Sequence, residues 1–293
     1  MGDLLVKGGT VVDGTGGPAA RADVRVREGT IVEVGAELRP DGERVLDAAG
    51  ATVAPGFIDI HTHYDGSMWW DPTVDPAPQH GVTTVLTGNC AISLAPANPE
   101  DRESIVDMFC FIEDLPVDAV LGAVPWSWTT WSEYRDTFND RGASCNVAPL
   151  VGHNNIRMAV LGQEAFERPA TDDERHRISD VVVEALRAGA YGVSLSFVDS
   201  DSRNRRVPSR LASPQELSDL AAAMATVGHG IVQYVPRFMK VDGYLKDIDR
   251  VDAACRQYGV TATYAPQPAA RPCGRRSPPA PASTPGSCST AAP

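Results

Sequence analysis

The sequence predicts an α/β protein built around a parallel β-sheet. From Gly56 onward, short apolar segments typical of buried strands alternate with amphipathic segments that carry helix-capping residues. Strands and helices that alternate along a chain form a parallel sheet with helical crossovers. This pattern fits both a (β/α)8 barrel and a doubly wound sheet. The first 55 residues instead show the alternation typical of half-buried β-strands.

Residues 1–55 are expected to form a separate β portion of the fold. Within residues 22–27, valines alternate with charged side chains, which is the two-residue period of a strand with one buried face. Gly29 then marks a hairpin turn before a second apolar segment, 30–35. So few strands cannot hold a core by themselves, and we expect this portion to pack against the rest of the chain.

Residues 56–264 are expected to form the (β/α) unit. Its helices are marked by capping boxes, as in Thr171 with Glu174 and Ser213 with Glu216, and by glycines at their ends. The expected helices cover residues 171–189, 213–228 and 242–259. The expected strands are Phe57–His63, Val82–Asn89, Val147–Val151, Gly192–Phe197 and Ile231–Val235.

Residues 265–293 are predicted to be a disordered tail. The segment is rich in proline and alanine and contains no aromatic residue and no Ile, Leu, Val or Met. Such a segment buries too little apolar surface to offset the entropy lost on ordering. The change in composition after Tyr264 is abrupt, as a shifted reading frame in GC-rich DNA would produce. We therefore expect the (β/α) pattern to be cut short at this point.

The composition excludes several classes of protein. With 43% hydrophobic residues the chain is too apolar to be disordered, and its net charge of −12 argues against binding to nucleic acid or to an anionic membrane. Neither a long apolar run nor a basic leader occurs, so the expected location is the cytoplasm. The scattered cysteines are expected to be free thiols or metal ligands rather than disulfides. Nothing in the sequence indicates an oligomeric state.

The clearest chemical signal is the H-x-H motif of His61 and His63, which ends an apolar segment introduced by Pro55 and Gly56. Residues two apart in a strand point to the same face, so the two imidazoles are expected to project together at the strand's C-terminal end. Two imidazoles fixed in this way can hold one cation, and zinc is among the metals that imidazole favours. The alternative is a pair of histidines that alternate on a strand without binding anything.

Cys90 is the second candidate ligand. It follows the next expected strand, at the end where parallel strands deliver functional groups. A metal there would lower the pKa of the thiol and bind the thiolate. The alternative, which the spacing alone leaves open, is a buried and unreactive cysteine.

Several motifs make the chain resemble the N-acyl-D-amino-acid deacylases, or D-aminoacylases, of the amidohydrolase superfamily. Between Pro55 and Pro96 these motifs are PGFIDIHTHYDG, WDP, HGVTTVLTGNC and LAP. Further similarity lies in IEDLP, in the three tryptophans of residues 126–131, in VGHNNIR and in AGAYGVSLS. The combination of H-x-H with G-N-C separates this group from other amidohydrolases. The resemblance covers residues 3 to 264.

The resemblance implies a fold, an activity and a cofactor. The fold is a (β/α)8 TIM-like barrel, incomplete in this chain, with a small β-sandwich to which the N-terminal portion contributes. The activity is hydrolysis of a small-molecule N-acyl-D-amino acid by zinc-activated water. His61 and His63 match the metal ligands of the first strand, and Cys90 matches a thiolate that can bridge two metals, so one or two zinc ions are implied. No lysine lies between Lys7 and Lys240, which excludes the carboxylated lysine that bridges the metals in hydantoinase-like relatives.

The chain also departs from the family pattern. The family has further ligand histidines on later strands, whereas the corresponding segment Gly230–Pro236 contains none. The family's catalytic aspartate on the last strand is absent, because the resemblance ends near the sixth strand, and no catalytic residue is assigned. Two functions therefore stay open: an active deacylase, and a catalytically inactive truncated barrel fragment with residual metal binding.

Three further residues are candidates for substrate binding. His153 ends an expected strand, Arg157 can pair with a substrate carboxylate, and Tyr64 directly follows the H-x-H motif. The alternatives are a structural hydrogen bond for His153 and a structural ion pair for Arg157. Asp65 is either a group that supports the metal ligands or a loop cap.

Overall fold

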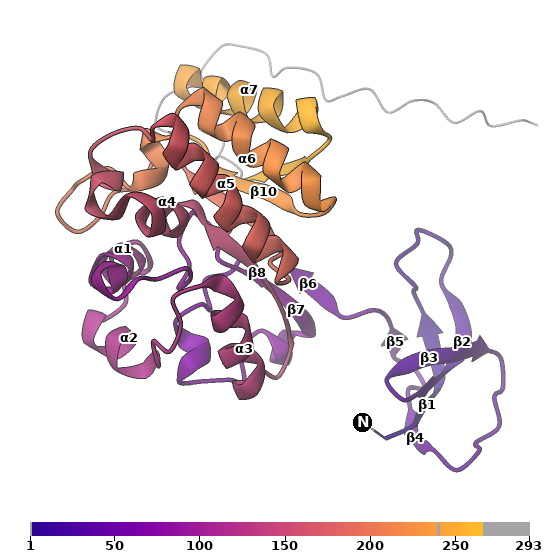
Figure 1. Ribbon diagram of the computed structural model, residues 1–293. Coiled ribbons are helices and arrows are strands. Elements are labelled where there is room, and N and C mark those ends of the chain that lie inside the picture. The colour runs from indigo at the N-terminus through magenta and orange to yellow at the C-terminus, as the bar shows by residue number, and fades with distance from the viewer. Residues whose placement is uncertain (1, 239–240, 266–293) are drawn as a thin grey trace, which may run out of the picture.

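A computed structural model of the chain describes residues 2–238 and 241–265. It contains two sheets, a five-stranded sheet near the N-terminus and a six-stranded sheet covered by helices. Figure 1 shows the N-terminal sheet set apart from the helical body. The tail predicted to be disordered, residues 265–293, lies outside the described residues apart from Ala265.

The N-terminal sheet is centred on β1 (Leu4–Val11). This strand runs antiparallel to β2 (Ala20–Arg27), which pairs antiparallel with β3 (Thr30–Gly35). Two short strands, β4 (Arg44–Asp47) and β5 (Thr52–Val53), pair in parallel with β1. The alternating pattern of the sequence therefore does form strands in this portion.

The N-terminal portion forms a single sheet in the described residues. The buried carboxylate of Asp23 ties this sheet to its loops, because it accepts the N–H groups of Gly8 at 2.7 Å and Leu38 at 2.8 Å. Large apolar side chains on the sheet are nevertheless exposed, namely Ile31, Val32, Val34, Val45 and Leu46. The second layer of a sandwich stays a prediction.

The second sheet decides between the two α/β folds that the sequence left open. Each strand pairs in parallel with the next strand along the chain, so the sheet lacks the reversal of strand order that defines a doubly wound fold. The doubly wound alternative is wrong, and the winding is that of a (β/α) barrel. Among the described residues the two outer strands pair on one side only, so the sheet is an open part of a barrel. In order across the sheet the strands are β6 (Phe57–Asp59), β7 (Val82–Thr87), β8 (Asn146–Gly152), β9 (Gly192–Ser196), β10 (Ile231–Val235) and β11 (Thr261–Tyr264).

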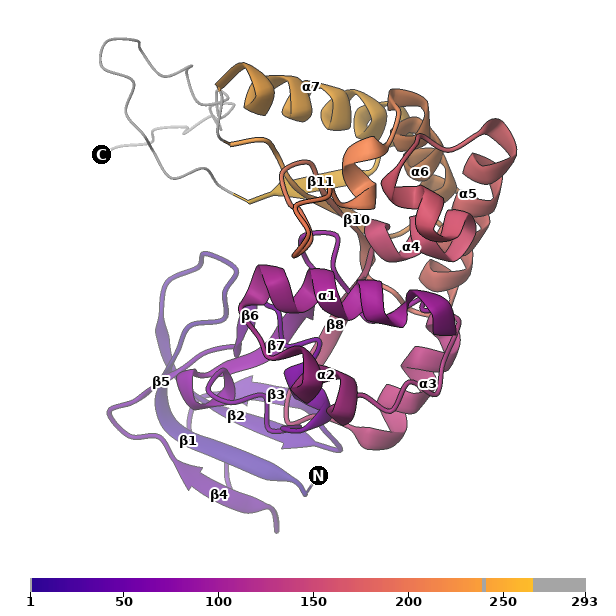
Figure 2. The same ribbon diagram turned by 90° about the vertical axis from the view of Figure 1, so that its left-hand side faces the viewer.

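The helices lie in the connections between the strands of this sheet and form two groups (Figures 1 and 2). The first group is α1 (Arg102–Glu113), α2 (Val117–Ala123) and α3 (Trp131–Arg141). The second is α4 (His153–Leu161), α5 (Asp172–Arg187), α6 (Pro214–Val227) and α7 (Val241–Tyr258). No described helix combines the length and the apolar composition needed to cross a bilayer.

The capping residues explain where two of these helices begin. At α5 the predicted box is complete, because Thr171 Oγ1 accepts the N–H of Glu174 and the Glu174 carboxylate accepts the N–H of Thr171. At α6 only half of the predicted box forms. Ser213 Oγ accepts the N–H of Glu216, but the Glu216 carboxylate turns into the protein interior instead.

The core lies between the helices and the outward-facing side chains of the sheet. Val193 and Leu195 on β9 alternate with Ser194, and all three are buried. The two apolar side chains face the helices, while Ser194 faces the concave side of the sheet. Apolar residues of the helices complete the cluster, among them Ile178, Val182, Leu217, Leu220 and Val251. This rigid layer holds the C-terminal ends of the strands in place.

Candidate metal centre

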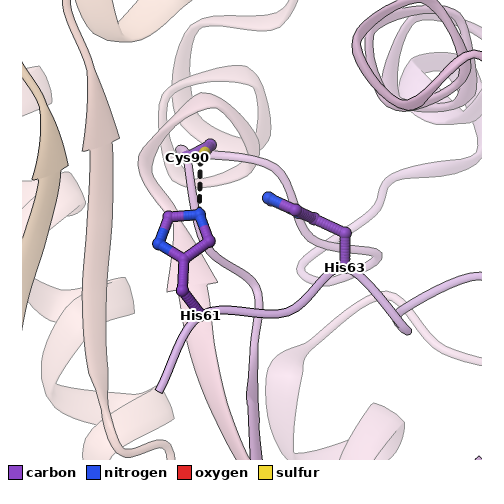
Figure 3. A group of neighbouring side chains, drawn as sticks. All are labelled: His61, His63 and Cys90. Carbon is purple, nitrogen blue, oxygen red and sulfur yellow. Dashed lines mark hydrogen bonds between the residues drawn. The ribbon is translucent and has the colours of Figure 1, made fainter. Parts of the chain in front are cut away.

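Three side chains converge at the C-terminal ends of β6 and β7. The potential ligand atoms of His61, His63 and Cys90 all lie within 4.8 Å of one another. Cys90 Sγ is 3.3 Å from His61 Nε2, and the two imidazole centroids are 5.3 Å apart. Figure 3 shows both rings directed toward Cys90. The structure therefore places the three predicted ligands side by side, and these residues, His61, His63 and Cys90, are called the nest below. Their role as metal ligands stays a prediction.

The route by which the histidines reach this nest differs from the prediction. The expected strand Phe57–His63 ends at Asp59, so the H-x-H motif follows the strand rather than forming part of it. The cause is Thr62, whose N–H and Oγ1 both donate to the carbonyl oxygen of Leu86, at 3.1 and 2.7 Å. These bonds turn Thr62 into the protein and leave the histidines on either side of it free to face Cys90.

The segment that carries Cys90 is held in an unusual backbone conformation. Gly88, Cys90 and Ala91 have φ angles of 72°, 57° and 64°, in the left-handed region that non-glycine residues rarely occupy. The carboxylate of Asp65 accepts the N–H of Gly88 at 3.1 Å. Burial raises the pKa of Asp65 to about 7. Asp65 therefore links the segment after the histidines to the segment before Cys90.

Replacing Gly88 by Ala is expected to destabilise the protein by more than about 2 kcal/mol. A Cβ atom at this position would lie 2.2 Å from the carbonyl oxygen of Leu150, and the φ angle of 72° is unfavourable for alanine. The measurement is urea unfolding. Gly122→Ala is the matched control, because nothing lies within 4 Å of the added Cβ there. Equal stability of the two variants would contradict the packing described for Gly88.

The protonation states favour metal binding by the histidines. Burial lowers the pKa of His61, and burial followed by the nearby His61 lowers the pKa of His63 to about 4. Both rings are therefore neutral at pH 7 and present free lone pairs. Burial raises the pKa of the Cys90 thiol, and nearby carboxylates raise it further. A cation would reverse this effect by stabilising the thiolate.

The donor set fits zinc. Two imidazole nitrogens and one thiolate are ligands that zinc favours, and three protein ligands leave a fourth position for water or substrate. His63 Nδ1 is buried without a hydrogen-bond partner among the described residues. A ring with an unsatisfied nitrogen in such a site is consistent with a ligand role.

Three residues at the nest were missed by sequence reasoning. Gln233 on β10 accepts the N–H of Cys90 through its Oε1 atom at 2.9 Å. Glu113, the last residue of α1, has a carboxylate oxygen 3.6 Å from His63 Nε2. Burial raises the pKa of Asp199, which accepts a hydrogen bond from Ser196 Oγ after β9. The sequence offers a weak signal for two of these positions, because Gln233 lies within an expected strand and Asp199 follows one. It offers none for Glu113.

The structure places the candidate substrate residues His153 and Arg157 in a buried cluster. Arg157 donates to both carboxylate oxygens of Glu216 at 2.6 Å, and His153 Nε2 lies 3.0 Å from the same carboxylate. His153 Nδ1 is 3.1 Å from Ser209 Oγ. Both side chains are fully buried, which matches the structural alternatives weighed for them. Their role in substrate binding stays a prediction.

Tyr64, the third candidate for substrate binding, is half-buried next to the histidines. It packs against a small apolar cluster that includes Met68 and Val85. Burial raises the pKa of its hydroxyl, so the side chain is an uncharged phenol at neutral pH. Its contact with a substrate also stays a prediction.

Comparison with known proteins supports the resemblance stated from the motifs. Residues 44–268 match the amidohydrolase family. N-acyl-D-aspartate deacylase of Alcaligenes xylosoxydans is 41% identical over 192 residues, which are 66% of this chain and 36% of that protein. D-aminoacylase of the same organism is 37% identical over 195 residues, 66% of this chain and 37% of that protein.

Solved structures give the same result. A D-aminoacylase mutant in complex with copper chloride has a TM-score of 0.72 at 30% identity, covering 90% of this chain and 51% of that chain. An N-acyl-D-glutamate deacylase of Bordetella bronchiseptica, complexed with zinc and a phosphonate inhibitor, has a TM-score of 0.71 at 29% identity, covering 89% and 50%.

This chain spans about two fifths of the curated relatives and about half of the solved chains. The family match covers most of the described residues, including His61, His63 and Cys90. The strand winding, the H-x-H motif and the thiol at the end of the next strand agree with it. The chain therefore belongs to the amidohydrolase family.

Proposed function

We propose that this chain carries a zinc site of the D-aminoacylase type and hydrolyses the amide bond of N-acyl-D-amino acids. The observation that carries the proposal is the convergence of His61, His63 and Cys90 within 4.8 Å. Support also comes from relatives named N-acyl-D-aspartate deacylase and D-aminoacylase, and from a similar deacylase complexed with zinc.

Zinc, when bound, supplies a Lewis acid that polarises an amide carbonyl and lowers the pKa of a water molecule toward about 7. His61, His63 and Cys90 would hold the ion through two neutral imidazoles and one thiolate. Thr62 and Asn89 fix the histidine segment, because Asn89 Nδ2 donates to the carbonyl oxygens of Thr62 and Leu86 at 3.1 and 2.9 Å. These bonds keep the imidazoles oriented before a ligand arrives.

Two carboxyl groups near the nest, those of Glu113 and Asp199, influence how a charged substrate can be oriented there. Burial raises the pKa of both Glu113 and Asp199, and the nearby Asp199 raises the pKa of Glu113 further. Where these carboxyl groups are ionised, they repel a substrate carboxylate from this side. We therefore expect the acyl amide, rather than the carboxylate of the amino acid, to lie against the nest.

The zinc-loaded chain is expected to hydrolyse N-acetyl-D-methionine and to act at least about tenfold more slowly on the L-enantiomer. A chelator should abolish turnover and added zinc should restore it, since the ligands hold the ion reversibly. Release of the free amine is the measurement. Cys90→Ala is expected to show no turnover. Stoichiometric zinc binding without hydrolysis of N-acyl-D-amino acids would favour the inactive fragment instead.

A further inference from the structure

Gln233 is a polar side chain buried in the central sheet. It sits in the middle of β10, only 2% exposed, on the concave side of the sheet beside Ser194 of β9. Burying an amide costs free energy unless it is hydrogen-bonded. Its Oε1 atom accepts the N–H of Cys90 at 2.9 Å, a link between residues 143 positions apart in the chain.

The bond from Gln233 is one half of a two-point anchor. The next N–H along the chain, that of Ala91, donates to Ser194 Oγ at 3.0 Å. Ser194 and Gln233 are paired in the register of β9 and β10, so two neighbouring strands each supply one acceptor to two consecutive N–H groups. Ser194 Oγ also donates to the carbonyl oxygen of Gly88. The turn that carries Cys90 is thus fixed on both sides.

The two anchored residues have an unfavourable backbone conformation. Cys90 and Ala91 have φ angles of 57° and 64°, a conformation that costs about 1 kcal/mol or more per non-glycine residue. Such residues keep this conformation only when their surroundings determine it. The direction of the Cα–Cβ bond of Cys90 follows from φ and ψ. A bond that fixes the backbone of Cys90 therefore also fixes where its thiol points.

We propose that Gln233 is a positioning residue of the metal centre. Its side-chain oxygen holds Cys90 in the left-handed conformation that directs the thiol to His61 and His63. The inference rests on the metal site proposed above, but the anchor consists of protein groups alone and is tested separately in the metal-free protein. Gln233 Nε2 is buried without a hydrogen-bond partner among the described residues, so the hydrogen bond recorded for this amide is the one that Oε1 accepts from Cys90.

Two substitutions separate the acceptor of Gln233 from its donor. Gln233→Met keeps the length of the side chain and removes both, whereas Gln233→Glu keeps an acceptor oxygen and removes the donor. Gln257→Met, at an exposed position of α7, is the matched control. Far-UV circular dichroism and thermal unfolding establish the temperature at which all variants are folded. Should Gln233→Met fail to fold, Ser194→Ala tests the other half of the anchor in the same assays.

The first readout is alkylation of Cys90 by iodoacetamide in the metal-free protein, followed by mass spectrometry of the Cys90 peptide. Gln233→Met is expected to react at least about fivefold faster than wild type, because the released turn opens more often. Gln233→Glu and Gln257→Met are expected to stay within about twofold of wild type, since both leave the bond to Cys90 in place. Equal rates for Gln233→Met and wild type would overturn the proposal.

The second readout is titration with Co2+, whose charge-transfer absorption reports a bound thiolate. Gln233→Met is expected to need about 10–100-fold more Co2+ for half-saturation, the usual loss when a group that orients a metal ligand is removed. If Gln233→Glu loses as much affinity as Gln233→Met, the acceptor role is wrong. If wild type shows no thiolate absorption at all, the proposed metal site fails, and the alkylation rates still decide the role of Gln233.

Discussion

Replacing Cys90 with Ser is expected to weaken zinc binding by at least about 100-fold, because removing a ligand costs more than removing a group that merely orients one. The thiolate is the only charged donor of the nest, and a serine hydroxyl stays protonated and binds zinc poorly. His61 and His63 alone would hold the ion through two neutral nitrogens. Competition with a chromophoric chelator measures the affinity.

The control for this experiment is Cys145→Ser. Cys145 is likewise a partly buried free thiol, but it packs in a different apolar cluster and is not part of the nest. Its replacement is expected to leave zinc affinity within about twofold, since it removes no ligand. If Cys90→Ser and Cys145→Ser bind zinc equally well, the ion is not held by Cys90.

Replacing Glu216 with Gln is expected to destabilise the fold by about 3–5 kcal/mol, the usual cost of removing one partner from a buried ion pair. The Arg157 guanidinium would remain fully buried without its carboxylate, and His153 would lose the carboxylate that lies 3.0 Å from its Nε2 atom. Urea unfolding gives the difference in free energy. Glu167→Gln is the control at an exposed position and is expected to change stability by less than about 0.5 kcal/mol.

The same cluster makes stability depend on pH. Burial alone would raise the pKa of Glu216, but the bonds and charges of His153 and Arg157 outweigh it and lower the pKa from 4.5 to about 2. Burial lowers the pKa of His153, so Arg157 provides the positive charge at neutral pH. A carboxyl whose pKa is lower in the folded state stabilises the fold above its unfolded pKa. This contribution is lost as the pH falls from 4.5 to about 2, and Glu216→Gln should lose less stability than wild type over that interval.

The nest could be predicted because it follows from general geometry. Parallel strands deliver their C-terminal ends to one edge of the sheet, so ligand-type residues at the ends of β6 and β7 were expected to meet. The same reasoning did not find the early end of β6. That end depends on the side chain of Thr62, which captures the carbonyl oxygen of Leu86 with its hydroxyl as well as its N–H.

Gln233 and Glu216 could not have been assigned from the sequence. The contact of Gln233 with Cys90 depends on how β10 lies in the sheet and on the path of the turn that carries Cys90, 143 residues earlier in the chain. Glu216 is the third residue of α6, at the glutamate position of a capping box. This position predicts that its carboxylate accepts the backbone N–H of the N-cap residue, Ser213. Its carboxylate instead lies against Arg157 and His153, because the buried guanidinium of Arg157 needs a carboxylate to balance its charge.

The choice between barrel and doubly wound sheet was likewise beyond the sequence pattern. Both folds alternate strands with helices, and they differ only in the order of strands across the sheet. That order depends on which side of the sheet each crossover connection passes. In the observed order β6 to β11, crossover helices such as α6 and α7 pack on the outward face of the sheet, and the concave side holds Ser194, Gln233 and the turn of Cys90.

X-ray absorption at the zinc edge of the loaded chain tests the metal centre most directly. One sulfur at about 2.3 Å is expected, together with nitrogen or oxygen neighbours at about 2.0–2.1 Å. The sulfur contribution should vanish in Cys90→Ser and persist in Cys145→Ser. A spectrum without sulfur, or one with several sulfurs that Cys90→Ser leaves unchanged, would show that the ion is not bound by His61, His63 and Cys90.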